Sequence, residues 1–235
     1  MNIKKTIKAH LPHSKLSEKI WVDNKMIPEF RNALLGISSA FIEYLGVPVD
    51  AIDITMTGSY ANYNYTVFSD IDLHILVDMQ SFNADDDLVK QFFNAKKSFW
   101  NDRHDIDLKG IEVELYPQDV NEPHTSSGVF SVKDDEWIVE PKKFKNGIDI
   151  SNIAKGSKNV IKEIESVLRD SIDSADTSDI VKMIKKLKKM RSSGLEKGGE
   201  LADENIIYKV IRSQGLLQKL FDTMADVEDL KLSSL

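Results

Sequence analysis

The sequence of 235 residues contains no cysteine. This absence excludes disulfide bonds and metal sites with thiolate ligands, and it says little about the compartment. No apolar run approaches the roughly 20 residues that a membrane-spanning helix needs, and the basic N-terminus lacks the apolar segment of a signal peptide. The five histidines do not have the spacing of a zinc site. We therefore expect a cytoplasmic protein with no membrane partner.

Acidic residues outnumber basic ones, and the net charge is −7 at pH 7. This balance argues against indiscriminate nucleic-acid binding over the whole surface. The exception is the segment 182–191, which has six basic residues and no acid. It either binds the phosphates of a triphosphate or of RNA, or forms the solvated face of an amphipathic helix, and the sequence leaves both interpretations open.

Two acids stand one residue apart at the start of an expected strand over residues 70–77. Side chains of a strand alternate between its two faces, so Asp70 and Asp72 project from the same face. Two neighbouring carboxylates repel each other unless a cation lies between them. Mg²⁺ prefers such oxygen ligands. The pair therefore predicts a site for Mg²⁺ or Mn²⁺.

A Gly-Ser pair precedes these acids. It follows an expected strand over residues 51–57, and Gly58 lets the backbone turn sharply and approach a ligand without a side chain in the way. Ser59 offers a hydroxyl and a backbone N–H to phosphate oxygens, at the start of an expected short helix over residues 61–65. The pair predicts a site for a triphosphate beside the acids.

A third acid is expected on a later strand, over residues 111–116. Glu112 and Glu114 share one face of this strand. Glu114 is favoured because it lies deeper in the apolar run, and Glu112 remains an alternative. Asp119 follows Pro117 and is expected to lie beyond the strand.

Gly58, Ser59, Asp70, Asp72 and Glu114 together resemble the signature of the DNA polymerase beta nucleotidyltransferase superfamily, in particular its small phage and bacterial members. The resemblance implies transfer of a nucleoside monophosphate from a nucleoside triphosphate such as ATP to an acceptor hydroxyl, with release of pyrophosphate. Two Mg²⁺ ions (or Mn²⁺) would be held by the three acids, roughly 4 Å apart. The acceptor could be RNA or tRNA, a protein, or a small molecule such as another nucleotide. The alternative is a catalytically silent nucleotide- or RNA-binding module of the same fold.

The expected fold class is α+β. Residues 1–24 are expected to form an N-terminal extension, and residues 25–145 a nucleotidyltransferase domain with a small mixed sheet flanked by helices. Helical periodicity from Ser151 onward predicts a helical domain over residues 151–235.

The helical part supplies further candidates for nucleotide binding. Glycines within residues 191–200 predict a tight loop near a ligand. In the helix expected from about residue 203, Lys209 and Arg212 are placed to reach nucleotide phosphates. The alternative is an ordinary helix–helix loop followed by a solvated helix face.

Overall fold

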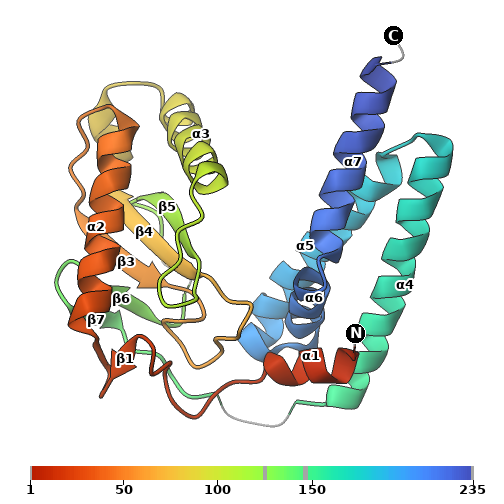
Figure 1. Cartoon of the computed structure of the whole chain (residues 1–235), viewed down its shortest axis with the longest axis horizontal. Coiled ribbons are helices and arrows are strands. Elements are labelled where there is room, and N and C mark those ends of the chain that lie inside the picture. The colour runs from red at the N-terminus through yellow and green to blue at the C-terminus, as the bar shows by residue number, and fades with distance from the viewer. Residues whose placement is uncertain (1, 124–125, 145–147, 234–235) are drawn as a thin grey trace. The chain divides into compact units, whose positions relative to one another are not determined.

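The computed structural model describes residues 2–123, 126–144 and 148–233. The chain divides into two compact units, one of Pro12–Phe144 and one that joins Met1–Leu11 to Lys145–Leu235. The first unit holds a small mixed sheet with helices, and the second is helical (Figure 1). The expected α+β class, with a small mixed sheet flanked by helices and a helical C-terminal part, is thus confirmed.

The sheet of the first unit has five strands in the order β5-β4-β3-β6-β7. Strand β3 runs antiparallel to both of its neighbours, β4 runs parallel to β5, and β7 closes the sheet antiparallel to β6. The strands extend over Asp53–Thr57 (β3), Ile71–Val77 (β4), Val113–Asp119 (β5), Val129–Ser131 (β6) and Glu136–Val139 (β7).

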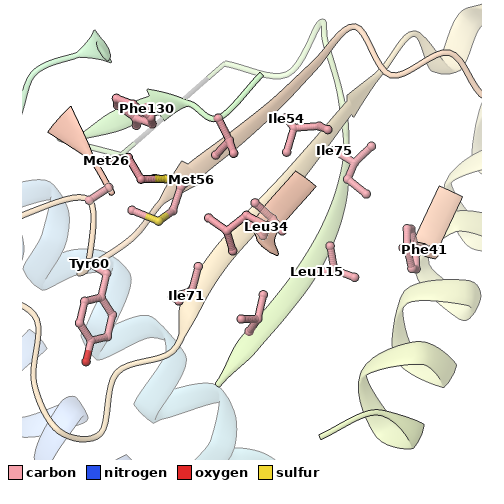
Figure 2. Packing of buried hydrophobic residues seen from close by; sticks show 14 of the residues in the cluster. Met26, Leu34, Phe41, Ile54, Met56, Tyr60, Ile71, Ile75, Leu115 and Phe130 are labelled. Carbon is pink, nitrogen blue, oxygen red and sulfur yellow. The ribbon is translucent and has the colours of Figure 1, made fainter. Parts of the chain in front are cut away.

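One face of this sheet is apolar and carries the core. Ile54 and Met56 of β3 lie opposite Ile75 and Leu73 of β4, and all four are buried. Helices α2 (Pro28–Leu45) and α3 (Asp86–Arg103) contribute to the same core, in which Phe41 of α2 is one of the buried side chains (Figure 2). The ring of Phe41 meets that of Trp100 on α3 edge to face, with centroids 5.4 Å apart. Because strand residues alternate, the polar residues between these apolar ones point to the other face.

Residues 1–24 do not form a separate extension. Helix α1 (Ile3–Ala9) belongs to the helical unit, where Ile7 is fully buried among residues of α4 to α7. Strands β1 (Trp21–Val22) and β2 (Lys25–Met26) form a small hairpin of the sheet unit, and Trp21 lies in its core. The segment is divided because its apolar side chains are buried in two different cores.

The helical unit differs from expectation at its glycines. Helix α5 continues through the residues expected to form a loop and ends only at Gly198. A Cβ atom at Gly194 would lie 3.0 Å from Cβ of Glu204, so this glycine allows α6 to pack closely instead of breaking α5. The helices of this unit extend over Ile150–Ser174 (α4), Ser178–Gly198 (α5), Asp203–Ser213 (α6) and Leu216–Ser233 (α7), with a short 3₁₀ helix over Gly199–Leu201; a second 3₁₀ helix, Met79–Phe82, belongs to the sheet unit.

Within the part of the chain that the structure describes, none of the helices combines the length and the apolar character needed to span a bilayer.

A histidine is buried in the helical unit. His10 follows α1, is 5% exposed, and its Nε2 lies 3.4 Å from Oγ of Ser213. Burial, assisted by the charge of Lys209, lowers the pKa of His10 from 6.5 to about 4. The unfolded chain therefore binds a proton at His10 at a higher pH than the folded chain does, so this group stabilises the fold above pH 6.5 and the stabilisation falls as the pH drops toward 4.

We expect the free energy of unfolding of the helical unit to fall by about 2 kcal/mol between pH 7 and pH 5 because of His10. Replacement His10→Gln, which cannot take up a proton, should flatten this fall. Urea denaturation followed by circular dichroism at both pH values measures the difference. An equal fall in both proteins would contradict this role for His10.

Candidate active site

The structure places the two strand acids side by side on the polar face of the sheet. Asp72 of β4 and Glu114 of β5 are paired neighbours in the parallel ladder, and both are half-buried. Adjacent strands lie about 4.8 Å apart, so the two carboxylates can reach one ligand. Asp70 comes directly before β4 and is also half-buried. The chain thus brings the three predicted acids to the same end of the two strands.

The backbone of Gly58 lies directly against Asp72. Gly58 follows β3 with φ +71°, and a Cβ atom built on it would lie 1.8 Å from Oδ2 of Asp72. The neighbouring residue Thr57 is the ladder partner of Asp72, which accounts for the contact. Any side chain at position 58 would therefore need both a left-handed backbone and the space that the carboxylate occupies. Ser59 begins the turn that follows.

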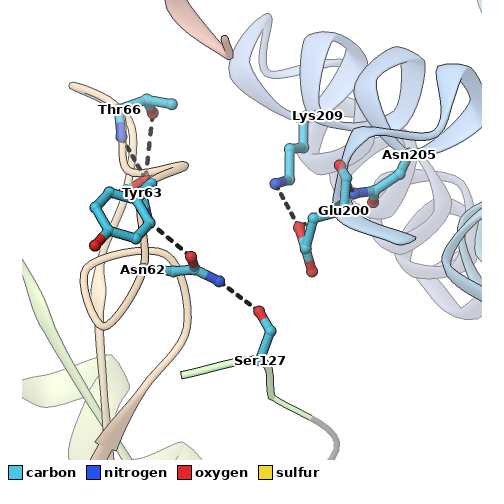
Figure 3. Close-up of polar contacts among 8 residues, drawn as sticks. Asn62, Tyr63, Thr66, Ser127, Glu200, Asn205 and Lys209 are labelled. Carbon is cyan, nitrogen blue, oxygen red and sulfur yellow. Dashed lines mark hydrogen bonds and ion pairs between the residues drawn. The ribbon is translucent and has the colours of Figure 1, made fainter. Parts of the chain in front are cut away.

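The chain after Ser59 forms turns, so the expected short helix over residues 61–65 is wrong. Oδ1 of Asn62 accepts a hydrogen bond from the backbone N–H of Tyr63 at 2.8 Å, and the Asn62 amide donates to Ser127 (Figure 3). Nearby, the backbone N–H of Thr66 donates to Oγ of Ser69 at 3.0 Å. Such bonds from side chains satisfy backbone groups locally and compete with a helix.

Strand β5 is longer than expected and includes Asp119. Pro117 pairs with Ile75 inside the ladder, which is possible because β5 is an edge strand and one side of its backbone needs no partner. Asp119 is buried, and its carboxylate accepts from the backbone N–H of Asn121 at 3.0 Å. By alternation along β5 its side chain points away from the face of Glu114.

The two candidates for the third acid have different surroundings. Glu112 is exposed and precedes β5, and its carbonyl accepts the backbone N–H of Ile71 at 2.8 Å. Glu114 is half-buried within β5, and its Oε2 accepts a hydrogen bond from the hydroxyl of Tyr116.

A group of polar side chains continues from the acids along the same face: alternation within residues 70–77 already places His74 there, whereas Tyr116 and Gln118 were not expected at the site. The ring of Tyr116 stacks on His74 with centroids 5.3 Å apart. Nε2 of His74 lies 3.0 Å from Oγ1 of Thr57, and its Nδ1 lies 2.8 Å from Oε1 of Gln118. Alternation within the expected strand over residues 111–116 would have found Tyr116, whereas Gln118 lies beyond the end that was expected before Pro117.

These side chains line a groove of about 320 Å³ on the sheet unit. The rings of His74 and Tyr116, the hydroxyl groups of Thr57 and Ser126 and the amide of Gln118 make it suitable for a polar ligand. The described residues that line it are Thr57, His74, Tyr116, Pro117, Gln118, Glu122, Pro123 and Ser126.

Negative charge converges on the hydroxyl of Tyr116. Its burial, its hydrogen bond to Glu114 and the charges of Glu114, Asp72 and Asp70 together raise the pKa of Tyr116 above its usual value of 10.0. The charge of Asp70 also contributes to a raised pKa at Tyr60, after burial and the neighbouring Tyr65. A site with this field favours a cation or a hydrogen-bond donor.

The donor set fits Mg²⁺ or Mn²⁺ in its chemistry. Carboxylate oxygens are the ligands these ions prefer, and Asp72 and Glu114 occupy paired positions on adjacent strands. As the side chains stand, no group of three or more His, Asp or Glu residues among those described is arranged to hold a metal ion.

Lys209 and Arg212, expected to contact phosphates, belong to α6 of the helical unit. Nζ of Lys209 lies 2.8 Å from Oε2 of Glu200, and both side chains are largely covered (Figure 3). Burial alone would raise the pKa of Glu200, but the charge and hydrogen bond of Lys209, together with the hydrogen bond of Asn205 and the charge of Arg191, outweigh it and lower this pKa. Lys209 thus has a structural partner, and a role of either residue in nucleotide binding stays a prediction.

Comparison with known proteins gives little guidance. No family model and no curated protein matches the chain. Among solved structures, the chain is similar to the STING-associated CdnE c-di-GMP synthase from Capnocytophaga granulosa, with a TM-score of 0.25 and 13% sequence identity over 88% of this chain and 84% of that one. A TM-score this low does not establish a common fold, and the candidate site stands on its own geometry.

Replacement Gly58→Ala should destabilise the sheet unit by more than the roughly 1–2 kcal/mol that a left-handed alanine costs, because its methyl group would meet the Asp72 carboxylate. Gly46→Ala is the matched control, since Gly46 has the same φ of +71° and its Cβ would meet only O of Tyr44, at 3.9 Å. Urea denaturation of both variants measures the difference.

The double variant Gly58→Ala with Asp72→Ala should recover part of the loss, because the colliding carboxylate is gone. Equal losses for Gly58→Ala and Gly46→Ala would contradict the close contact.

Proposed function

We propose that this chain is a metal-dependent nucleotidyltransferase that moves a nucleoside monophosphate from a nucleoside triphosphate to an acceptor hydroxyl and releases pyrophosphate. The observation that supports it most is the paired position of Asp72 and Glu114 on adjacent parallel strands, with the Asp72 carboxylate against the bare backbone of Gly58. A carboxylate pair next to a backbone without a side chain suits the binding of a divalent cation and a polyphosphate together.

The proposal assigns separate roles in metal binding and phosphate binding to the residues of the site. Asp70, Asp72 and Glu114 would hold two Mg²⁺ or Mn²⁺ ions, and Gly58 and Ser59 would orient the phosphate chain. The ions, when bound, supply positive charge that stabilises the leaving pyrophosphate and lowers the pKa of the attacking hydroxyl. Positioning by the protein contributes the remainder, as is general for transfer of phosphorus groups.

The proposed acceptor is RNA or tRNA, a protein or a small molecule, and since a fold does not determine a substrate, an experiment must distinguish these classes. Incubating the protein with radiolabelled nucleoside triphosphates and total RNA, lysate protein or buffer alone would separate these classes. Label on RNA, on protein or on a small product identifies the acceptor directly.

Replacement Asp72→Asn or Asp70→Asn should abolish the release of pyrophosphate, because each removes the charge that holds a divalent cation. The folds of both variants should be unchanged by circular dichroism, since these side chains are half-buried on the polar face. The measurement is pyrophosphate release with each nucleoside triphosphate in the presence of Mg²⁺ or Mn²⁺.

Asp87→Asn is the matched control, because Asp87 is an exposed aspartate in the first turn of α3. Full activity of Asp72→Asn would contradict the proposal. Metal-dependent nucleotide binding by the wild-type protein without any pyrophosphate release would instead indicate a silent binding module.

Comparison of Glu114→Gln with Glu112→Gln should identify the third acid. We expect Glu114→Gln to lose at least 100-fold in turnover and Glu112→Gln less than threefold, since only Glu114 pairs with Asp72 in the ladder. Steady-state pyrophosphate release measures both. The reverse order would assign the role to Glu112.

A further inference from the structure

The hydroxyl of Tyr116 is a neutral donor at the edge of the carboxylate group. It donates to Oε2 of Glu114, the residue two positions earlier on the same face of β5. The bond engages one oxygen of that carboxylate and leaves the other available to a ligand. Carboxylates that hold metal ions are commonly oriented in this way by a second layer of hydrogen bonds.

The ring of Tyr116 is itself held in place. His74 stacks on it with centroids 5.3 Å apart, and Nζ of Lys97 lies 5.0 Å from its centroid. His74 in turn has each ring nitrogen within hydrogen-bond distance of a side chain, Thr57 on β3 and Gln118 on β5. The hydroxyl is thus fixed by contacts that come from three strands and from α3.

We propose that Tyr116 is a positioning residue that orients Glu114 for binding the divalent cation, and that His74 keeps the Tyr116 ring in place. This inference rests on the proposed function. It also gives a physical reason for preferring Glu114 to Glu112 as the third acid, because the tyrosine hydroxyl donates to Glu114.

The test measures direct binding of Mn²⁺ to the full chain, and electron paramagnetic resonance reports the concentration of the free ion. Replacement Tyr116→Phe removes only the hydroxyl, and we expect the dissociation constant for Mn²⁺ to rise roughly 10- to 100-fold. In pyrophosphate release, the Mn²⁺ concentration for half-maximal rate should rise by the same factor, while kcat at saturating Mn²⁺ should stay within about threefold of the wild-type value. A general loss of packing would not produce this split.

Tyr44→Phe is the matched control. Tyr44 lies on α2, Nζ of Lys96 lies 4.7 Å from its ring centroid, and its hydroxyl has no hydrogen-bond partner among the residues that the structure describes. Its Mn²⁺ affinity should equal that of the wild-type protein. If Tyr116→Phe fails to fold, His74→Gln provides the second variant, and its Mn²⁺ affinity should fall by a smaller factor.

The outcomes separate this inference from the proposed function. If the wild-type protein binds Mn²⁺ and Tyr116→Phe (or His74→Gln in its place) binds it equally well or more tightly, the positioning role of Tyr116 is wrong, but the proposed function still stands. Wild-type protein that binds no Mn²⁺ at millimolar concentration overturns both.

Discussion

The contact between the Asp72 carboxylate and the backbone of Gly58 is the constraint on which the candidate site depends. It follows from the antiparallel pairing of β3 with β4, which places Thr57 opposite Asp72 and brings the residue after Thr57 beside the carboxylate. A change of register by one residue would turn Asp72 into the core and separate the two groups. The position of the site is therefore determined by the same ladder that holds the sheet together.

One face of the sheet stabilises the fold, and the other carries the polar residues of the candidate site. Apolar residues such as Met56, Leu73 and Leu115 are fully buried against α2 and α3 and stabilise the unit. The alternate residues, Asp72, His74, Glu114 and Tyr116 among them, form a polar face with converging negative charge. A rigid core behind a charged face lets the protein hold repelling carboxylates together without losing the fold, because the burial of apolar surface offsets the repulsion.

Much of the sheet unit could be predicted from the sequence. Proline in the first turn, glycine at the end and aspartate at the N-cap are local helix signals, and they stand here at Pro28 and Gly46 of α2 and at Asp85, which accepts the N–H of Leu88 at the start of α3. The predicted ends of two elements were wrong, because tertiary packing overrides the local signal of a proline or a glycine. Pro117 does not end β5, because an edge strand tolerates proline, and Gly194 does not break α5, because it allows close packing with α6.

The sequence by itself determined which residue types are available and which side chains share a face, because alternation along a strand is a local property of the backbone. It therefore predicted Gly58, Asp70, Asp72 and Glu114, with Glu112 as the alternative to Glu114, as candidates for the site. Only the tertiary structure decided that β4 and β5 pair in parallel with Asp72 beside Glu114, and that Tyr116 donates to Glu114 rather than to solvent. The pairing of Asp72 with Glu114 joins residues far apart in the chain, and the hydrogen bond of Tyr116 depends on the side chains that pack around its ring. No local sequence pattern encodes these two contacts.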